Sequence, residues 1–158
     1  MPSNSAQSTS VSLGPAREEE SEELVSLRIA AMRESLERLG RFDAQRARER
    51  FLVGFVAEFT RHILADGERV GFVAVKPTPD GLSLEHLYVR PEYQGRGIGS
   101  AVLAILFEEA DRRALPLRVG ALRGSDANRF YLRHGFIVVE ESEWDIYYVR
   151  PAQPRRAG

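Results

Sequence analysis

The stretch "PEYQGRGIGSAVL", from Pro91 to Leu103, decides the fold of this chain. It follows a run in which apolar residues alternate, and it precedes a run in which they recur at helical spacing. Gly95, Gly97 and Gly99 are therefore expected in a turn from a strand into a helix. Such a turn offers unhindered backbone N–H groups beside the positive end of a helix dipole. This arrangement favours an anionic ligand, usually a phosphate.

The residues before this stretch predict one strand, two helices and three further strands. Apolar residues alternate with serines at Val11 and Leu13, helical spacing then continues to Gly40, and a second helix is expected over Ala44 to Phe55. From residue 59 onward the period changes to two, in "TRHILA", "RVGFVAVKP" and "LSLEHLYV". Tight turns at Asp66-Gly67 and at residues 79–81 join these segments, which predicts an antiparallel meander.

The residues after the glycines predict two helices and three strands. The segment "IGSAVLAILFEEADRRA" is an apolar helix, "LPLRVGAL" a strand, and "DANRFYLRH" a helix that ends at Gly135. The segments "FIVVEES" and "WDIYYVR" form a closing hairpin. The predicted order is β-α-α-β-β-β-α-β-α-β-β. This order indicates an α/β (α+β) protein with a mixed sheet and no repeating βαβ unit.

The composition is that of one soluble globular domain. The chain has 158 residues, 43% hydrophobic and 28% charged, and a formal net charge of −1. That charge argues against nucleic acid or a membrane surface as the general partner. Residues 1–8 and 151–158 are expected to be flexible tails around a domain over residues 9–150. The chain begins without the apolar segment of a signal peptide and has no run of about 18 apolar residues, which predicts a cytoplasmic protein.

The chain contains no cysteine, and this excludes several kinds of chemistry. Disulfides, cysteine zinc sites and a cysteine acyl-enzyme are all impossible. The three histidines, His62, His86 and His134, lack metal-ligand spacing, so no metal is expected. His86 is expected to pack in the interior, and His134, at the end of a helix, to lie at the surface.

Three phosphate ligands compete for the glycine turn. A P-loop for ATP or GTP requires a lysine after its last glycine, but the only lysine is Lys76, on an earlier strand. A dinucleotide fold requires a glycine where Ser100 stands and an acid at the end of the next strand, which here reads "GALRG". Arg123 could meet the 2′-phosphate of NADP, so this alternative stays open. The third ligand is the pyrophosphate of coenzyme A.

The glycine turn resembles the signature of the GCN5-related N-acetyltransferase (GNAT) superfamily, Gln/Arg-x-x-Gly-x-Gly/Ala. The matching residues are Gln94-Gly95-Arg96-Gly97-Ile98-Gly99. A second segment, "GSDANRFYLRHGF", resembles the later helix motif of the family. The resemblance covers about Val11 to Arg150. It implies a GNAT-like, mostly antiparallel central sheet of six to seven strands flanked by about four helices, and acetyl-CoA as co-substrate.

The resemblance also implies how acetyl-CoA is held. Backbone N–H groups from Gln94 to Gly99 would cradle the pyrophosphate, Ser100 would add a hydroxyl and Arg96 a charge. The fourth and fifth strands of the fold separate, so that the backbone at Leu87 and Val89 would bind the pantetheine arm and the thioester carbonyl. The full set of residues expected at the cofactor is Leu87, Tyr88, Val89, Gln94, Gly95, Arg96, Gly97, Ile98, Gly99, Ser100, Asn128 and Tyr131. Ser125 competes with Asn128 for the role of an amide that many members carry.

Two residues are expected to transfer protons. Tyr131 occupies the position of the family's general acid, and a phenol can donate its proton to the departing thiolate. Glu85 has the same strand parity as Leu87 and Val89, which places its carboxylate near the incoming amine as a general base. The alternatives are a packed aromatic residue and a solvent-facing glutamate.

The acceptor is expected between the first two helices and the closing hairpin, and each residue predicted there also has a structural explanation. The candidates are Arg28, Met32, Arg33, Phe42, Trp144 and Tyr147. The leading prediction is acetyl transfer to a primary amine, of a small molecule or a peptide, by direct attack in a ternary complex. The alternative is a non-catalytic acyl-CoA-binding sensor or regulatory module. The chain is expected to be a monomer or homodimer.

Overall fold

The structure is a computed structural model that describes residues 9–38, 40 and 43–154. Its strands and α-helices follow the predicted order. They are β1 (Val11–Pro15), α1 (Ser21–Arg38), α2 (Ala44–Gly54), β2 (Thr60–Ala65), β3 (Glu68–Thr78), β4 (Gly81–Val89), α3 (Ile98–Arg112), β5 (Leu117–Leu122), α4 (Ala127–Arg133), β6 (Ile137–Glu141) and β7 (Asp145–Arg150). Short 3₁₀ turns lie at η2 (Glu18–Glu20), η3 (Ala57–Phe59) and η4 (Pro91–Tyr93).

The predicted turn and cap residues begin and end these elements. Helix α1 is followed by Gly40 at φ +70°, and α4 by Gly135 at φ +91°. A glycine adopts this left-handed conformation without the steric cost that other residues bear. Helix α2 begins after Asp43, whose carboxylate accepts a hydrogen bond from the Arg46 N–H at 3.1 Å.

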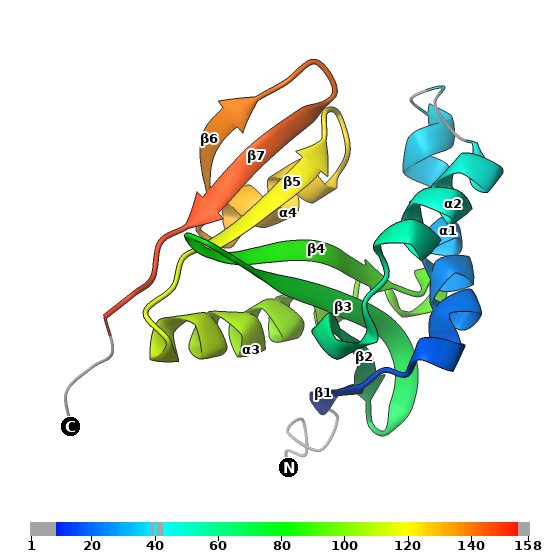
Figure 1. The fold of residues 1–158 in the computed structure, drawn as a ribbon, viewed down its shortest axis with the longest axis horizontal. Coiled ribbons are helices and arrows are strands. Elements are labelled where there is room, and N and C mark those ends of the chain that lie inside the picture. Colours follow the sequence, from blue (N-terminus) through cyan, green and yellow to red (C-terminus); the bar gives the residue numbers. More distant parts are fainter. Residues whose placement is uncertain (1–8, 39, 41–42, 155–158) are drawn as a thin grey trace, which may run out of the picture.

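The strands form one seven-stranded sheet in the order β1-β2-β3-β4-β5-β7-β6. All neighbours are antiparallel except β4 and β5. The parallel pairing of β4 with β5 covers only three residue pairs, from Leu82↔Leu117 to Leu84↔Val119. Beyond Leu84 the two strands separate, and Figure 1 shows β5, β7 and β6 turning away from β3 and β4. The predicted mixed, mostly antiparallel sheet with separating central strands is confirmed.

Strand β4 contains a β-bulge where the two strands part. Its register against β3 runs from Ala74↔His86 directly to Val75↔Leu84, so Glu85 is the extra residue. The bulge interrupts the alternation of side chains along the strand. Leu82 and Leu84 before it, and Leu87 and Val89 after it, consequently pack against the same hydrophobic cluster.

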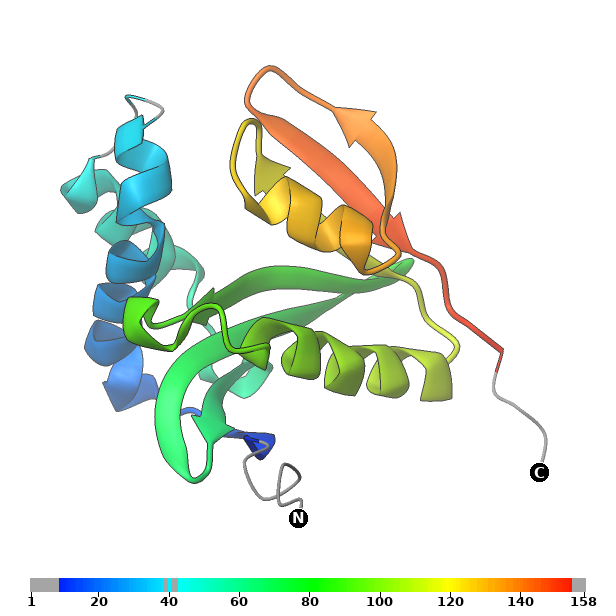
Figure 2. The same ribbon diagram turned by 180° about the vertical axis from the view of Figure 1, so that it is seen from behind.

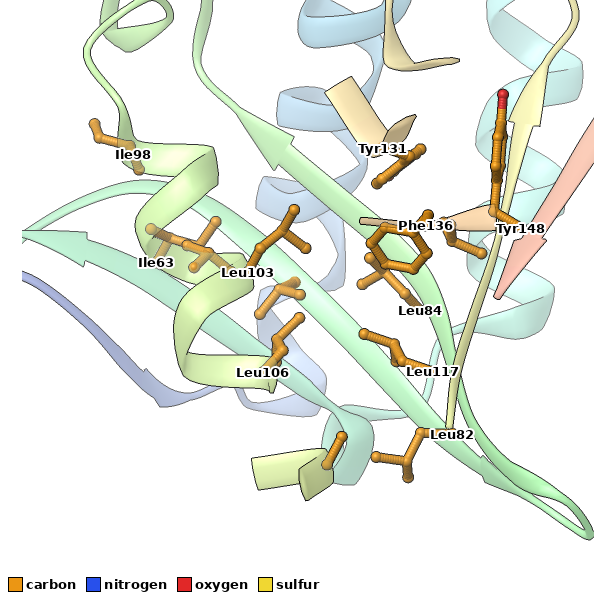
Figure 3. Packing of buried hydrophobic residues seen from close by; sticks show 14 of the residues in the cluster. Ile63, Leu82, Leu84, Ile98, Leu103, Leu106, Leu117, Tyr131, Phe136 and Tyr148 are labelled. Atoms are coloured by element: carbon orange, nitrogen blue, oxygen red, sulfur yellow. The ribbon is translucent and has the colours of Figure 1, made fainter. Parts of the chain in front are cut away.

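Two hydrophobic clusters cover the two faces of the sheet. Helix α3 packs on one face, and Figure 3 shows its Leu103 and Leu106 facing Leu84 of β4 and Leu117 of β5. Figure 2 shows α3 and α4 on this same face. Helices α1 and α2 cover the other face through a smaller cluster around Phe51 of α2 and Phe72 of β3. The end of the sheet between β4 and β5 is thereby left open.

The described chain continues past β7 along helix α3. Arg150 forms a two-pronged ion pair with Asp111 of α3, at 2.8 and 3.1 Å, and its guanidinium lies 4.1 Å from the centre of the Phe107 ring. The Gln153 N–H also donates to Asp111, at 2.9 Å. These contacts bind residues 150–153, which include part of the tail predicted from residue 151, to the outer end of α3.

Candidate active site

A cleft of about 680 Å³ lies where β4 and β5 separate. Its walls come from β4, the glycine-rich turn, the beginning of α3, the end of β5 and helix α4. Ala31, Met32 and Leu36 of α1 close the opposite end. The cleft thus reaches from the predicted cofactor residues to α1, one of the three elements that the sequence predicted around the acceptor. No described residue of α2 or of the β6–β7 hairpin lines it.

The glycine-rich turn presents a row of backbone amides to the cleft. Gly95 and Gly97 have φ values of +79° and +78°, and Gly97 is the N-cap of α3. The first hydrogen bond that enters α3 runs from Ala101 N–H to the Gly97 carbonyl at 3.1 Å. Within the described part of the chain, the amides from Gly95 to Ser100 donate to no protein acceptor. Together with the helix dipole, they form a site suited to a phosphate.

Gln94 stabilises this turn through two hydrogen bonds, so its backbone amide is not among those free to bind a ligand. Its backbone N–H donates to the Pro91 carbonyl at 3.2 Å, and its side-chain amide donates to the Val89 carbonyl at 2.9 Å. The free amides therefore begin at Gly95, one residue later than predicted. Gly99 is small for an internal reason, since a Cβ there would lie 3.1 Å from Cζ of Phe130 on α4.

The open edge of β4 supplies further backbone groups. The Val89 carbonyl is bound by the Gln94 side chain, and the Arg90 N–H bonds to Val70 of β3. In an antiparallel pair, the N–H and C=O of one residue point to the same edge, and this edge alternates along the strand. The Val89 N–H and the polar backbone groups of Leu87 consequently face the side that β5 has left. This geometry suits the extended amide chain and the thioester of coenzyme A.

Tyr131 projects from α4 into the cleft. Its side chain is 7% exposed and contacts the rings of Phe130, Phe136 and Tyr148. Its hydroxyl makes no hydrogen bond within the described residues, yet it is not among the fully buried unpaired atoms, so it reaches the open space of the cleft. Burial, with a smaller contribution from nearby Tyr88, raises the pKa of Tyr131 above its ordinary value. The phenol is consequently protonated at neutral pH and can donate a proton.

Glu85 lines the same cleft. It is the extra residue of the β4 bulge, exposed, and hydrogen-bonded by the Ser83 hydroxyl. No arginine or lysine of the described chain forms an ion pair with it. The Glu85 carboxylate is thus not held by a cation. The bulge, and not simple strand parity, determines its direction.

His86 also lines the cleft, although the sequence predicted only a packed residue. Its ring packs among Phe51, Phe72 and Tyr88, at centroid distances of 5.2 to 5.8 Å. Burial and, second, the charge of Arg28 lower its pKa to about 4. The imidazole is therefore neutral at pH 7 and forms part of an aromatic wall beside Glu85.

Several predicted site residues lie outside the cleft. Arg28 donates to the Ala47 carbonyl and lies over the Tyr88 ring, so it joins α1 to α2 and β4. Arg33 forms an ion pair with Glu37 on α1, and the Arg96 guanidinium lies over the Tyr93 ring. Trp144 is 51% exposed, and the Tyr147 ring packs against Gly120. Among the acceptor candidates, Met32 lines the cleft, whereas Phe42 lies outside the described residues.

Asn128 is used within the protein. Its amide nitrogen donates to the carbonyls of Leu122 and Ser125, at 2.9 and 3.0 Å, and its oxygen accepts from the Tyr148 hydroxyl at 2.6 Å. The side chain thus fixes the β5–α4 loop and is not part of the cleft wall. Ser125, the competing residue, does line the cleft, although its hydroxyl donates to the Leu122 carbonyl.

Two arginines in the cleft were not predicted. Arg129 and Arg133 are exposed, stand one turn apart on α4, and form no ion pair with the described acidic residues. Arg133 lies over the Phe130 ring, beside the glycine-rich turn. Their four-residue spacing on a helix that follows the glycine motif was the signal available in the sequence. Both guanidinium groups are available for phosphate contacts.

The described residues contain no group of three or more His, Cys, Asp or Glu that could hold a metal ion. Nor does any helix in the described ranges have the length and apolar character that crossing a membrane requires.

A model of a known protein family matches the central part of the chain. The model of the acetyltransferase (GNAT) domain matches residues 51–138, which is more than half of the chain. These residues include the meander, the glycine-rich turn and helix α4. No curated protein sequence matches the chain.

Many solved structures share the fold at low sequence identity. The PaiA N-acetyltransferase of Thermoplasma acidophilum, in complex with coenzyme A, aligns over 90% of this chain and 99% of its own at a TM-score of 0.74 and 18% identity. An acetyltransferase of Thermus thermophilus aligns over 90% of this chain and 97% of its own, at a TM-score of 0.69 and 22% identity. The apo form of YjaB from Escherichia coli aligns over 91% of this chain and 99% of its own, at a TM-score of 0.72 and 19% identity.

Proposed function

Because the chain belongs to the GNAT acetyltransferase family and is therefore an acyltransferase that uses acetyl-CoA, we propose that it acetylates a primary amine by direct attack in a ternary complex. One observation carries this proposal. The unpaired edge of β4, the free amides of the glycine-rich turn and the unbonded Tyr131 hydroxyl all face one cleft. The neighbour from Thermoplasma acidophilum was solved with coenzyme A, which supports the same ligand here.

The phosphates and the pantetheine arm of coenzyme A would each have a counterpart in the cleft. The amides from Gly95 to Ser100 would bind the pyrophosphate, and the guanidinium groups of Arg129 and Arg133 would meet its remaining phosphate charge. The backbone at Leu87 and Val89 would hold the pantetheine arm. Acetyl-CoA supplies the acetyl group as an activated thioester.

The proton transfers are divided between two sides of the cleft. The Glu85 carboxylate accepts the proton that the amine loses as its nitrogen attacks the thioester carbonyl. A backbone N–H of the open β4 edge stabilises the negative charge on the carbonyl oxygen. As the carbon–sulfur bond breaks, Tyr131 donates its proton to the leaving thiolate. Glu85 then releases its proton to solvent and Tyr131 takes one up, so both groups return to their starting states. The products are an amide and the free thiol of coenzyme A.

The Tyr131 assignment is tested by Tyr131→Phe, with Tyr147→Phe as the matched control outside the cleft. We expect turnover of Tyr131→Phe to fall by about 10²–10⁴-fold, the usual contribution of one positioned proton donor. Acetyl-CoA affinity should stay within about twofold, because the phenol acts as the thiolate departs. The measurements are calorimetric binding and release of the coenzyme A thiol with a panel of amines. Turnover within about threefold of wild type would return Tyr131 to a packing role.

The Glu85 assignment is tested by the pH dependence of Glu85→Gln. The variant should be most impaired at low pH, where the amine arrives protonated and needs a base. Raising the pH toward the pKa of the amine deprotonates it in solution and should restore much of the turnover. Tyr131→Phe should show no such recovery. Parallel pH profiles for the two variants would contradict the division of roles.

A further inference from the structure

His134 joins the end of α4 to the beginning of α3, at the phosphate end of the cleft. Its Nε2 lies 2.8 Å from the Ser100 hydroxyl, and its Nδ1 lies 2.8 Å from the Phe130 carbonyl oxygen. The His134 backbone N–H bonds to Tyr131, so it does not satisfy the Phe130 carbonyl in the usual helical manner. The imidazole therefore caps α4 with one nitrogen and contacts Ser100 with the other.

These two contacts fix where the protons lie. A carbonyl oxygen can only accept a hydrogen bond, so Nδ1 of His134 carries a hydrogen. In the neutral ring Nε2 then has a lone pair, and the Ser100 hydroxyl must donate its hydrogen to it. Ser100 lines the cleft beside the free amides of the glycine-rich turn. With its hydrogen engaged, the hydroxyl can offer only lone pairs to a phosphate.

Protonation of His134 would reverse this hydrogen bond. Nε2 would then donate to the Ser100 oxygen, and the hydroxyl hydrogen would become free to bind an anion in the cleft. The new charge would stand at the C-terminal end of α4, where the helix dipole favours a cation. Both changes favour a bound phosphate.

Beside His134, the charged groups of α4 and of the glycine-rich turn are arginines. On α4, the guanidinium of Arg133 lies 5.9 Å from the centre of the Phe130 ring, which the imidazole also contacts. Arg129 is a turn earlier on α4, and on α3 the facing polar group is Ser100. In the glycine-rich turn, Arg96 lies over the Tyr93 ring. No carboxylate of the described chain forms an ion pair with His134.

We propose that His134 is a positioning residue of the cofactor site, which turns the Ser100 hydroxyl toward the pyrophosphate of coenzyme A and couples binding to the uptake of a proton. The proposal rests on the assignment of the glycine-rich turn to that pyrophosphate. It adds a condition to the expectation that Ser100 contributes a hydroxyl at the pyrophosphate, and it gives His134 a role beyond the helix surface.

Dephospho-CoA is the suitable probe. Coenzyme A carries a 3′-phosphate whose second proton titrates near pH 6, within the range of histidine, and this group would mask the effect. Dephospho-CoA lacks it and keeps the pyrophosphate, which stays ionised across the range. The full-length protein is titrated calorimetrically between pH 5.5 and 8, in two buffers of different ionisation enthalpy, so that proton uptake is measured directly.

Wild type should bind dephospho-CoA about three- to tenfold more tightly at pH 5.5 than at pH 8, with uptake of up to one proton. Ser100→Ala should bind more weakly at pH 5.5 and lose most of the pH dependence. His134→Gln can donate a hydrogen bond to Ser100 without titrating, so its affinity should be independent of pH and no weaker than wild type at pH 8. His62→Gln, at a histidine on β2 whose partner is Glu20, should retain the wild-type profile.

The outcomes separate the two proposals. Binding of dephospho-CoA by wild type without pH dependence, or with a dependence that both Ser100→Ala and His134→Gln retain, would overturn the role of His134 alone. Absence of binding at every pH would overturn the assignment of the cofactor site and this inference with it. Thermal unfolding of each variant identifies any that has failed to fold, and Ser100→Thr, which keeps the hydroxyl, should restore the coupling.

Discussion

At the scale of single residues, the three glycines of the turn are needed for two different reasons. Gly95 and Gly97 have positive φ values, and a Cβ on either would meet open space. Gly99 has no positive φ but lies against Phe130. The first two therefore serve the backbone conformation and the approach of a ligand, whereas the third serves the packing of α3 against α4.

Gly97→Ala should separate strain from ligand binding. A non-glycine residue in the left-handed region costs about 1–2 kcal/mol, so the melting temperature should fall. The matched control is Gly67→Ala in the β2–β3 turn, where φ is +87° and a Cβ also meets open space. Both variants should lose similar stability, but only Gly97→Ala should lose acetyl-CoA affinity, by about tenfold or more. Equal affinities in the two variants would show that the turn has no ligand function.

At the scale of elements, the position of α4 depends on a network behind the cleft. The Asn128 side chain accepts a hydrogen bond from the Tyr148 hydroxyl of β7 and donates to the carbonyls of Leu122, at the end of β5, and Ser125, in the loop that follows. This one side chain thus ties α4 to the two strands that separate from β4. The orientation of Tyr131, three residues later, depends on that attachment.

Asn128→Ala should therefore act mainly on stability. It removes the side-chain hydrogen bonds of Asn128 and leaves the Tyr148 hydroxyl without its partner, which costs about 1–3 kcal/mol for a group left unsatisfied in the interior. The Leu122 and Ser125 carbonyls keep hydrogen bonds from the backbone N–H groups of Ser125 and Asn128. Urea unfolding should show the loss, and Tyr148→Phe, which removes only one of these bonds, should lose less. An Asn128→Ala protein with unchanged stability but weaker acetyl-CoA binding would instead make Asn128 a cofactor ligand.

At the scale of the whole molecule, an ion network far from the cleft fixes the first turn to the sheet. Glu20 of η2 contacts buried His62 of β2 at 2.9 Å and Arg69 of β3 at 2.7 Å. The His62 hydrogen bond, followed by the Arg17 amide and the charges of His62 and Arg69, lowers the pKa of Glu20 to about 2. The network places the beginning of α1, whose later residues Ala31, Met32 and Leu36 line one end of the cleft.

This lowered pKa predicts an acid-sensitive contribution to stability. Because the folded pKa lies below the ordinary value of 4.5, the stabilisation is complete above pH 4.5 and is lost as the pH falls toward 2. Glu20→Gln should thus be less stable than wild type at pH 6, by about 1–3 kcal/mol, and the difference should shrink between pH 4.5 and 2. Denaturant unfolding across this range measures it, with Glu19→Gln as the exposed control. A difference that does not change with pH would contradict the role of the charge.

The sequence by itself determined the elements, their order and the position of the glycine-rich turn that is proposed to bind a phosphate. Periodicity, positive-φ glycines and caps are properties of the local backbone, so Gly40, Gly97 and Gly135 could be interpreted without knowing any distant contact. The same local signals identified the helix that carries Tyr131. The four-residue spacing of Arg129 and Arg133 on that helix could have predicted that both lie on the same side of it.

Only the tertiary structure decided which side chains face the cleft and which are hydrogen-bonded within the protein. The bulge at Glu85 arises from the register of β4 against β3, and the open edge of β4 from its early separation from β5. Asn128, Arg28 and Ser100 each have a partner at least 19 residues away in the chain. A hydrogen bond between such distant residues leaves no periodic trace in the sequence, because it depends on how separate elements pack. For that reason the sequence could predict that Ser100 lies at the phosphate but could not show its hydrogen bond to His134.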